Sequence, residues 1–576
     1  MYRSFQREFE AVIKDIQLGR IQGKIWYVAV TPGGGKSCLP LMLTQLIPHH
    51  VDKLCWIVPR VVLASQAESV FVHKGLQSLF PHTARIRHDT NTPNPTRGLQ
   101  GYATTYNAVA NCPELHAKEF ARFRYALFLD EPHHVKTHFE QPEHPDLSWS
   151  QALQPLIDQA AFVIYASGTF ERHDQKPIHG VPYRQTTEGY VVDFPPTQTI
   201  RYRRQQALYE KAIVPLHFIV RNGKAVWRDV KGEEIERESF DETSYESGQM
   251  LDVVLETEFA RQLLADTVEH WRGHRQHCLN AKLLVVAPRI SLARKYVAWL
   301  KTDHGLTVKL ATSNDTKEAK EAIDAFKGRR QPALDVLVTV GMAYEGLDVP
   351  DITHIACLTR YRSRPWLEQC FARACRTRDG KHAGYIFAPD DPLLNQVMNA
   401  IIAEQEAVAR DTPNGESSNP GTGGCEPFGP DPKIVPLRSK ATEMRAYDFQ
   451  QSMSREETAR IALVMQQQGI LGVSPLQLKR AIDALEVGKP GVEEENIDEE
   501  ELTPTEIEDR YKKRIDDHTK SADYHYFDGD WGATSTEILR AGFKGREGMG
   551  ESELRQLWEW LQNRYPLGPL SEEEVV

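Results

Sequence analysis

The stretch that most constrains the fold runs from residue 24 to residue 37, where an apolar segment meets a glycine-rich turn. Residues 25–30 are all apolar, which predicts a buried strand, because the run is too short to make a good helix. Three glycines follow at 33–35, then Lys36 and Ser37, and then a mostly apolar segment that suits the opening of a helix. A strand, a glycine turn and a helix start in this order are what binding a nucleotide's phosphates requires.

Each residue type in this turn has a physical role in phosphate binding. Glycine lets backbone N–H groups close on phosphate oxygens, so we assign Gly33, Gly34 and Gly35 to nucleotide binding, and the helix terminus adds positive potential. Lys36 would reach the β and γ phosphates, and the Ser37 hydroxyl would hold Mg²⁺. The alternative is a flexible turn that carries a chance lysine. The preceding strand and the intact Gly-Lys-Ser favour the phosphate loop.

Composition limits the remaining classes. A chain of 576 residues with 40% hydrophobic and 26% charged residues indicates several globular domains. No run approaches the ~18 apolar residues of a membrane span, and the charged N-terminus lacks a signal core, so we expect a cytoplasmic protein without a membrane partner. Eight scattered cysteines without a Cys-x-x-Cys pair argue against zinc. With a net charge of −11, any nucleic acid must bind a local basic surface.

Two carboxylates follow the next informative strand. The strand expected at residues 124–129, which is apolar after Arg124, leads directly into Asp130 and Glu131, with His133 two positions later. One carboxylate can hold the Mg²⁺ that bridges the phosphates, and its neighbour can orient or deprotonate the attacking water. Asp-Glu pairs are common on surfaces, but this one comes after a strand and downstream of a phosphate loop. A further strand at 161–166 leads into Ser167 and Thr169. Strands that alternate with helices predict a parallel sheet with ligands at the carboxyl ends.

A second α/β series begins near residue 282 and carries a pair of arginines. Arg373 and Arg376 stand three apart, so on a helix they share a face. Two guanidiniums that project together suit a γ-phosphate, whose developing charge they can neutralise. The alternative is a solvated basic helix. Gln369, together with the turn at 345–348, favours the phosphate role.

At these intervals the motifs resemble those of superfamily 2 helicases. Residues 33–37, 130–133 and 167–169 resemble motifs I, II and III, although Val30 replaces the usual first glycine of motif I. Further likenesses cover residues 59–66 (motif Ia), 104–105 (the next strand-contacting motif), 288–289 (motif IV), 339–350 (motif V) and 369–376 (motif VI, with Ala372 and Cys375 in place of glycines). The resemblance runs from about residue 25 to residue 378, roughly two thirds of the chain.

The resemblance implies a fold and a set of roles. The fold is α/β, with two tandem RecA-like domains of parallel strands and an ATP cleft between them. Catalysis would fall to Lys36, Asp130, Glu131 and the arginine fingers Arg373 and Arg376. Gln6 would read adenine, and Gly346 and Asp348 would order the cofactor site. Nucleic acid would contact Pro59, Arg60, Thr104, Thr105, Arg289 and Thr339; coupling would involve His133, Ser167, Thr169 and Gln369.

We expect five parts along the chain. Residues 1–190 would form the first RecA-like domain, 191–275 a connector, 276–410 the second RecA-like domain, 411–436 a flexible linker and 437–576 a mainly α-helical accessory domain. In the connector, Asn222-Gly223 favours a hairpin turn. The connector either packs on the first domain or touches nucleic acid.

The expected accessory domain carries two features of its own. Helices at 454–467 and from 474 form either a DNA-binding helix-turn-helix or an ordinary helical pair. The aromatic residues near 524–531 and 558–560 are expected to form a core rather than a base-stacking platform.

The function expected from these features is ATP-dependent translocation along nucleic acid and its unwinding, with ATP and Mg²⁺ as cofactors. DNA is favoured over RNA, because the Asp-Glu-Pro-His box and the Gln-x-x-x-Arg-x-x-Arg pattern look closer to restriction and phage-like DNA motors. A protein partner could bind the C-terminal domain. Two alternatives stay open: a nucleic-acid-stimulated ATPase that acts as a clamp or recruitment subunit without unwinding, and an RNA remodeller.

Overall fold

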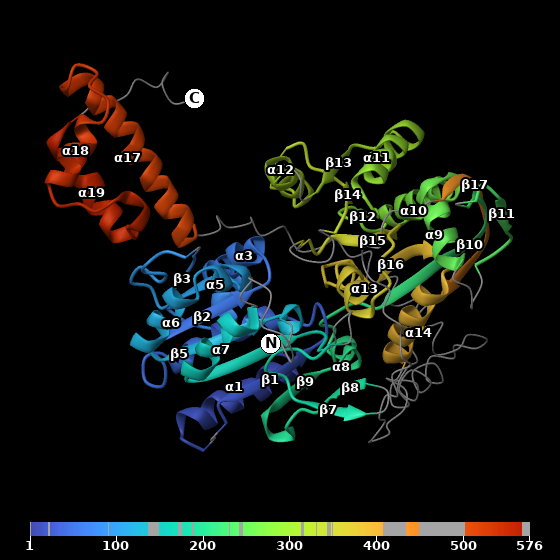
Figure 1. Cartoon of the computed structure of the whole chain (residues 1–576), viewed down its shortest axis with the longest axis horizontal. Coiled ribbons are helices and arrows are strands. Elements are labelled where there is room, and N and C mark those ends of the chain that lie inside the picture. The colour runs from blue at the N-terminus through green and yellow to red at the C-terminus, as the bar shows by residue number, and fades with distance from the viewer. Residues whose placement is uncertain are drawn as a thin grey trace, which may run out of the picture.

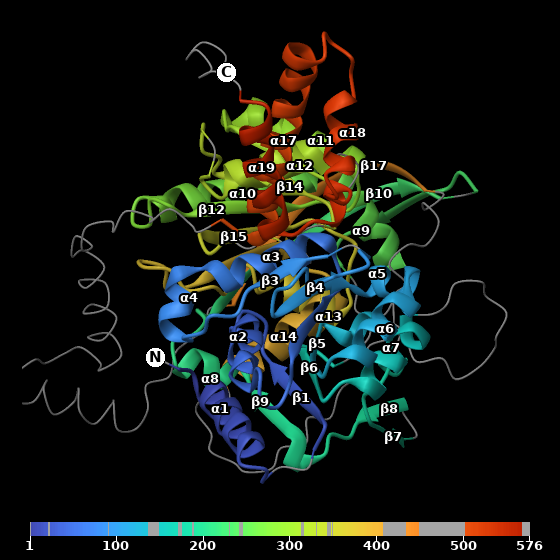
Figure 2. The same cartoon turned by 90° about the vertical axis from the view of Figure 1, so that its left-hand side faces the viewer.

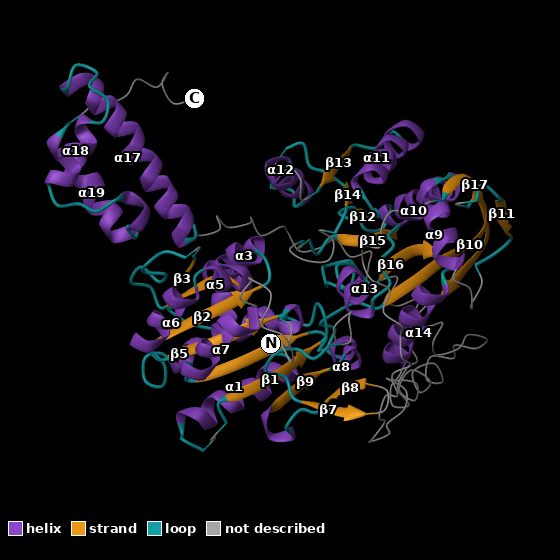
Figure 3. Cartoon of the chain, viewed as in Figure 1, coloured by secondary structure: helices purple, strands orange, loops and turns teal. Residues whose placement is uncertain are grey.

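The computed structural model describes residues 2–20, 23–89, 91–135, 149–170, 176–186, 189–229, 231–240, 246–312, 316–329, 331–341, 347, 349–406, 434–447 and 502–566. Two α/β lobes and a separate helical module make up this described part of the chain (Figure 1). Figure 3 shows that each lobe is built around its own sheet with helices packed against it. The predicted α/β fold with a helical C-terminal region is therefore confirmed.

The first lobe contains a seven-stranded sheet in the order β3-β4-β2-β5-β6-β1-β9, and every neighbouring pair is parallel. Its strands are β1 (Ile25–Val30), β2 (Lys53–Val58), β3 (Ile86–His88), β4 (Gly101–Thr105), β5 (Tyr125–Asp130), β6 (Phe162–Ser167) and β9 (Thr199–Tyr202). The helices are α1 (Ser4–Gln17), α2 (Leu39–Leu43), α3 (Val61–Val72), α4 (Lys74–Leu79), α5 (Tyr106–Asn111), α6 (Pro113–Arg122), α7 (Trp149–Gln159) and α8 (Arg204–Tyr209). A small hairpin pairs β7 (Tyr183–Thr186) with β8 (Gly189–Val192). Central strands such as β5 are buried along their whole length, as expected where helices cover both faces of a parallel sheet.

The second lobe has an eight-stranded sheet in the order β11-β10-β16-β15-β12-β14-β13, with β17 paired to β10. Its strands are β10 (Leu216–Arg228), β11 (Glu234–Arg237), β12 (Lys282–Val286), β13 (Val308–Ala311), β14 (Val336–Thr339), β15 (Ile352–Cys357), β16 (Gly384–Pro389) and β17 (Val435–Tyr447). The helices are α9 (Glu246–Glu256), α10 (Glu258–Arg275), α11 (Ile290–His304), α12 (Thr316–Phe326), α13 (Arg364–Phe371) and α14 (Pro392–Glu406). Within this sheet the neighbouring strands β10, β16, β15, β12, β14 and β13 all pair in parallel. The strands β11 and β17 both run antiparallel to β10.

The predicted hairpin at Asn222-Gly223 is wrong, because both residues lie inside the continuous strand β10. Gly223 is needed there for close packing: a Cβ atom on it would lie 2.5 Å from the Phe259 ring and 2.9 Å from the Lys440 carbonyl oxygen. Asn222 accepts hydrogen bonds from the N–H groups of Gly223 and Phe240, where β10 and β17 are out of register. A dipeptide typical of turns here marks a local irregularity between strands.

Two strands of the second lobe's sheet lie in segments that the sequence analysis did not assign to that lobe. β10 falls in the expected connector, 191–275, and β17 begins in the expected linker and continues into the expected helical domain, yet both join the second lobe's sheet. Pairing β10 in parallel with β16 satisfies its backbone groups, which local sequence patterns could not foresee. The rest of the predicted linker, up to residue 433, and both helices of the predicted helix-turn-helix lie outside the described residues.

The C-terminal module consists of α17 (Pro504–Tyr526), α18 (Ala533–Arg540) and α19 (Glu551–Arg564). Thr503 caps α17 and Pro504 occupies its first turn, which is the preferred chemistry for a helix start. Trp558 and Trp560 pack against the module's small core, as predicted. Tyr524 and Trp531 do not: their exposed fractions are 66% and 69%, so the prediction that they form a core is wrong.

The module sits above α3 and β3 of the first lobe (Figure 2). None of the helices in the described ranges combines the length and apolar character needed to cross a membrane.

Candidate nucleotide site between the two lobes

The predicted phosphate loop has the backbone that its glycines allow. After β1 ends at Val30, Gly33 and Gly35 adopt φ angles of 81° and 88°, in the left-handed region that residues with a side chain avoid. Gly35 then begins a short 3₁₀ turn at Lys36–Cys38, and α2 follows. Ser37 is exposed on this turn. The predicted order of strand, glycine turn and helix is therefore present, although the helix is short.

Lys36 and the two predicted carboxylates meet in the first lobe. The Lys36 Nζ atom lies 3.0 Å from Asp130 Oδ1 and also pairs with Glu131. The exposed fractions of the three side chains are 17%, 11% and 13%, so these charges are largely removed from water. One cation thus faces two carboxylates at the end of β5, and the surplus negative charge suits a divalent cation.

The predicted coupling residues converge on Glu131. Ser167 Oγ donates a hydrogen bond to Glu131 Oε2 over 2.5 Å, and the N–H of Thr169 donates to Ser167 Oγ. His133 Nδ1 lies 3.3 Å from the same Glu131 oxygen, and its ring is buried. Glu131 also has a φ of 49°, a left-handed conformation that costs a residue with a side chain on the order of 1–3 kcal/mol. Such strain persists where surrounding contacts hold the residue in position, and it is typical of functional sites.

The arginine segment of the second lobe lies beside the phosphate loop. A Cβ atom on Gly33 would be 3.9 Å from the Ala372 carbonyl oxygen and 4.0 Å from Cys375 Cβ. Arg376 follows directly and is half-buried, and the loss of solvation around its guanidinium lowers its pKa to about 10. Arg373 Nη1 donates a hydrogen bond to the Leu347 carbonyl oxygen over 3.2 Å. Residues that are far apart in the chain therefore share one site between the lobes.

Helix α1 brings Gln6 and an unforeseen residue, Arg3, to the same loop. Gln6 Nε2 would be 3.7 Å from a Cβ atom on Gly35, and the Arg3 guanidinium is closer still. Gln6 Oε1 accepts a hydrogen bond from the backbone N–H of Arg3 over 2.9 Å, which fixes the Gln6 side chain against the start of α1. Their spacing of three residues, one helical turn, was the signal in the sequence that could have identified Arg3.

The residues predicted to contact nucleic acid have mixed environments. Arg60 stands at the N-cap of α3, directly after Pro59, and the next residue, Val61, is 53% exposed. Thr105 Oγ1 accepts a hydrogen bond from the Ala108 N–H and so caps α5, and Arg289 pairs with Glu256 over 2.8 Å.

The threonines Thr104 and Thr339 are buried, and so is Gln369. Gly346 and Asp348 lie outside the described residues. For all the predicted strand-contacting residues, binding to nucleic acid stays a prediction.

The donors near the loop suit Mg²⁺ better than a metal held by protein alone. No group of three or more His, Cys, Asp or Glu side chains among the described residues could hold a metal ion. Mg²⁺ in nucleotide sites needs only one or two protein oxygens, with phosphate and water completing its shell. The exposed Ser37 hydroxyl and the Asp130 carboxylate fit that requirement.

Comparison with known proteins finds a helicase domain in the second lobe. The family model of the helicase conserved C-terminal domain matches residues 268–378, which include β12, β14, β15 and the arginine segment. This part of the chain is therefore similar to the C-terminal domain of helicases. An uncharacterized protein of Mycobacterium tuberculosis is 26% identical over 397 residues, which cover 67% of this helicase-like chain and 62% of the relative. The chain therefore matches less than two thirds of that relative's length.

Two further likenesses involve restriction enzymes. The type I restriction enzyme EcoKI endonuclease subunit of Escherichia coli is 23% identical over 390 residues, which cover 61% of the helicase-like chain and 31% of the subunit. The solved structure of the ATP-dependent type ISP restriction-modification enzyme LlaBIII bound to DNA aligns with a TM-score of 0.46 and 13% identity. That alignment covers 98% of this chain and 41% of the enzyme.

Proposed function

We propose that this helicase-like protein hydrolyses ATP to translocate along nucleic acid and unwind it, with DNA as the preferred polymer. The observation that carries the proposal is the position of Gly33 beside Ala372 and Cys375, which joins the phosphate loop of one lobe to the arginine segment of the other. A nucleotide bound at the loop would touch both lobes, so its hydrolysis could change how the lobes meet.

Each residue of the first lobe has a task in this proposal. Lys36, which pairs with Asp130 and Glu131, would turn to the β and γ phosphates when a nucleotide enters. Ser37 and Asp130 would then hold Mg²⁺, which neutralises phosphate charge when bound. Glu131 would orient the attacking water, because Ser167 and His133 fix its carboxylate.

The second lobe would complete the site with Arg373 and Arg376. Their guanidiniums would stabilise charge on the γ-phosphate, a role that needs the lobes to meet. Hydrolysis would remove this bridge and let the lobes separate. Strand-contacting residues on both lobes, among them Thr105, Arg289 and Thr339, would then advance along the backbone.

DNA is preferred on two grounds. The Asp-Glu-Pro-His box and the spacing of Gln369, Arg373 and Arg376 resemble those of DNA motors. In addition, one relative, which aligns with this chain over 390 residues, is named as a restriction endonuclease subunit. An RNA remodeller and a clamp that hydrolyses ATP without unwinding are the two other outcomes that the test below distinguishes.

The test measures ATP hydrolysis by the full chain without polymer and with single-stranded DNA, duplex DNA or RNA, alongside a strand-separation assay. We expect stimulation by DNA, with strand separation. Glu131→Gln should lower hydrolysis by about 10²–10³-fold and preserve nucleotide binding, because it removes the carboxylate but keeps the side-chain shape. Stimulation by RNA alone would indicate a remodeller, and stimulation without strand separation would indicate a clamp. Equal rates with and without every polymer would contradict the proposal.

A further inference from the structure

Helix α17 of the C-terminal module carries a row of exposed cations. Arg510, Lys513, Arg514 and Lys520 are all exposed, and their spacing puts them along one side of the helix. The opposite side holds Ile515 and its neighbours, which form the module's core with α19. The cations are therefore on the outer side of the module, where a partner could reach them.

The charge of this row is not cancelled inside the module. None of the four cations forms an ion pair with any residue in the described ranges. Nearby carboxylates are already engaged: Asp509 pairs with Lys512, Asp516 pairs with Arg546, and Glu506 accepts hydrogen bonds from Thr503. Asp517 and Glu506 lie on the same side of the helix as the row by their spacing, so four cations accompany two carboxylates and the row keeps an excess of positive charge. Such an excess is notable in a chain whose net charge is −11.

An exposed aromatic ring extends the row. Tyr524 follows Lys520 by four residues, which puts it on the same side of α17, and it is 66% exposed. At 1.5 Å per residue, the distance along the helix from Arg510 to Tyr524 is about 21 Å. Cations that follow a phosphate backbone, together with aromatic rings that stack on bases, are the means by which proteins hold single strands, at ~4–16 nucleotides per site.

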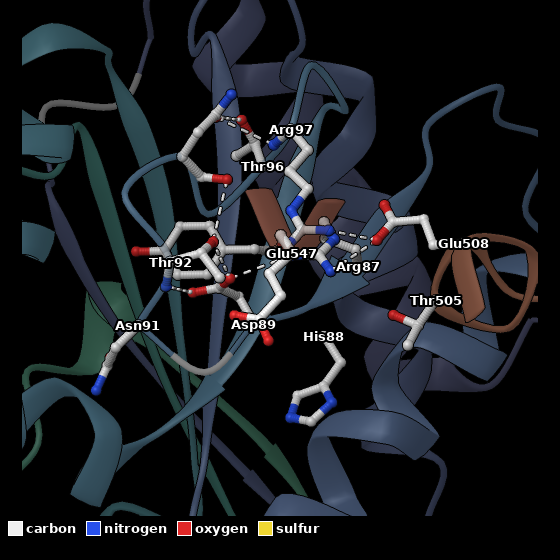
Figure 4. Close-up of polar contacts among 12 residues, drawn as sticks. Arg87, His88, Asp89, Asn91, Thr92, Thr96, Arg97, Thr505, Glu508 and Glu547 are labelled. Carbon is white, nitrogen blue, oxygen red and sulfur yellow. Dashed lines mark hydrogen bonds and ion pairs between the residues drawn. The ribbon is translucent and has the colours of Figure 1, made fainter. Parts of the chain in front are cut away.

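A buried ion-pair cluster fastens this helix to the first lobe. Glu508 accepts hydrogen bonds from Arg87 over 3.1 Å and from Arg97 over 2.6 Å, and Arg87 also pairs with Asp89 (Figure 4). The exposed fractions of the Glu508, Arg87 and Arg97 side chains are 2%, 5% and 5%. Arg97 donates further hydrogen bonds to the carbonyl oxygens of Met549 and Glu547, on the module's side. Breaking a buried pair of this kind costs about 3–5 kcal/mol, so α17 moves with the first lobe.

The attachment also sets where the row lies. The Thr505 N–H, at the base of α17, donates a hydrogen bond to Glu68 of α3 over 2.7 Å. The same helix, α3, begins at the predicted strand-contacting residue Arg60. In Figure 1, α17 lies between α18 and α19 on one side and the second lobe on the other. Its outer side therefore lies on the second lobe's side of the module, above α3.

We propose that the outer side of α17, defined by Arg510, Lys513, Arg514, Lys520 and Tyr524 and here called the α17 basic face, binds a single strand of nucleic acid. It would extend the strand's path beyond the two lobes, at a position held constant relative to α3 by Glu508. The inference rests on the proposed function, because it assumes that the lobes act on nucleic acid. Phosphate is the group recognised, and the tyrosine would stack on a base.

The test compares the full chain with two quadruple variants that lose the same charge. In the test variant, four residues are changed to Gln: Arg510, Lys513, Arg514 and Lys520. In the control variant, four other exposed cations, which lie on α18, on α19 and in the loop between them, are changed to Gln: Arg540, Lys544, Arg555 and Arg564. Binding of a fluorescent single-stranded oligodeoxynucleotide is followed by anisotropy over a range of salt concentrations. Because each lost phosphate contact lowers the slope of log affinity against log salt by ~0.7, we expect a slope smaller by up to about 3 and affinity at least about tenfold weaker at low salt.

The control variant should bind like the unaltered chain, and both variants should keep the rate of ATP hydrolysis measured without polymer. Unchanged affinity and slope in the test variant, or an equal loss in the control variant, would overturn the assignment. The two proposals fail separately. If polymer does not stimulate hydrolysis by the unaltered chain, the proposed function fails; if stimulation is intact and the test variant binds normally, only the α17 basic face fails.

Discussion

Two clusters of carboxylate–cation ion pairs, one within the first lobe and one between that lobe and the C-terminal module, differ in their surroundings. In the candidate nucleotide site, Lys36 faces Asp130 and Glu131, and these side chains are 11–17% exposed. At the attachment of the module, Glu508 faces Arg87 and Arg97, and these side chains are 2–5% exposed. The first cluster lies next to a glycine loop that only the Arg3 and Gln6 side chains approach at Gly35, whereas the second is enclosed by two parts of the chain.

The difference lies in charge balance and in access. Lys36 leaves one of its two carboxylates uncompensated, so a phosphate and a cation can enter and re-pair the three groups. Around Glu508 two guanidiniums meet two carboxylates, counting Asp89, and backbone carbonyls take up further N–H groups. An open, unbalanced cluster is able to exchange partners, whereas a closed, balanced one holds two elements together. The predictions below test this contrast.

The largest effect is expected at the open cluster. Lys36→Met should lower ATP hydrolysis by about 10²–10³-fold, because it removes a positive group that would contact the β and γ phosphates. Hydrogen exchange of the C-terminal module should stay as in the unaltered chain. Steady-state hydrolysis and exchange, measured on the same preparation, check both parts. A variant that hydrolyses ATP at the normal rate would show that this cluster is structural.

An effect of comparable size but of a different kind is expected at the closed cluster. Glu508→Ala leaves two buried guanidiniums with Asp89 alone, so docking of the module should weaken by about 3–5 kcal/mol. Hydrogen exchange over residues 503–566 should accelerate, while hydrolysis without polymer stays unchanged.

Glu559→Ala is the matched control, because Glu559 is exposed on α19 and forms no ion pair with another described residue. Equal exchange in the two variants would contradict an anchoring role for Glu508.

The smallest effect concerns His354, a buried histidine of the second lobe whose imidazole is neutral in the folded chain. Burial and the neighbouring His270 and His274 lower the pKa of His354 well below 6.5, and its Nε2 lies 2.8 Å from His270 Nδ1. Below pH 6.5 the unfolded chain therefore binds more protons, and the second lobe should lose up to about 1.4 kcal/mol of stability per pH unit. His354→Phe keeps a ring against Tyr385 and should flatten this dependence.

The measurement for His354 is the denaturant midpoint of the second lobe's transition over the range from about pH 7 to about pH 5. Substitution of the exposed His49 by Gln serves as the comparison. If His354→Phe loses stability with falling pH as steeply as the His49 variant, protonation of His354 does not cause the loss.

Local patterns predicted the elements whose neighbours in the chain decide their structure. The apolar run of β1, the glycines after it and the carboxylates at the end of β5 occur where the sequence indicated, because a buried strand followed by a turn is specified within a few residues. The hairpin at Asn222-Gly223 failed for the opposite reason. There, pairing with β16 and β17 and contact with Phe259 outweigh a local turn preference.

By itself the sequence determined the α/β class, the backbone of the candidate phosphate loop and the charged residues around it, since each depends on short-range spacing. Only the tertiary structure decided which charges meet. It brought Ala372 and Cys375 to Gly33, put Arg3 beside Gly35, and buried Glu508 between two arginines of the first lobe. Arg87 and Glu508 are 421 residues apart, and no periodicity in the chain links them. A buried ion pair depends on the exclusion of water by surrounding parts of the fold, which exists only once the chain has folded.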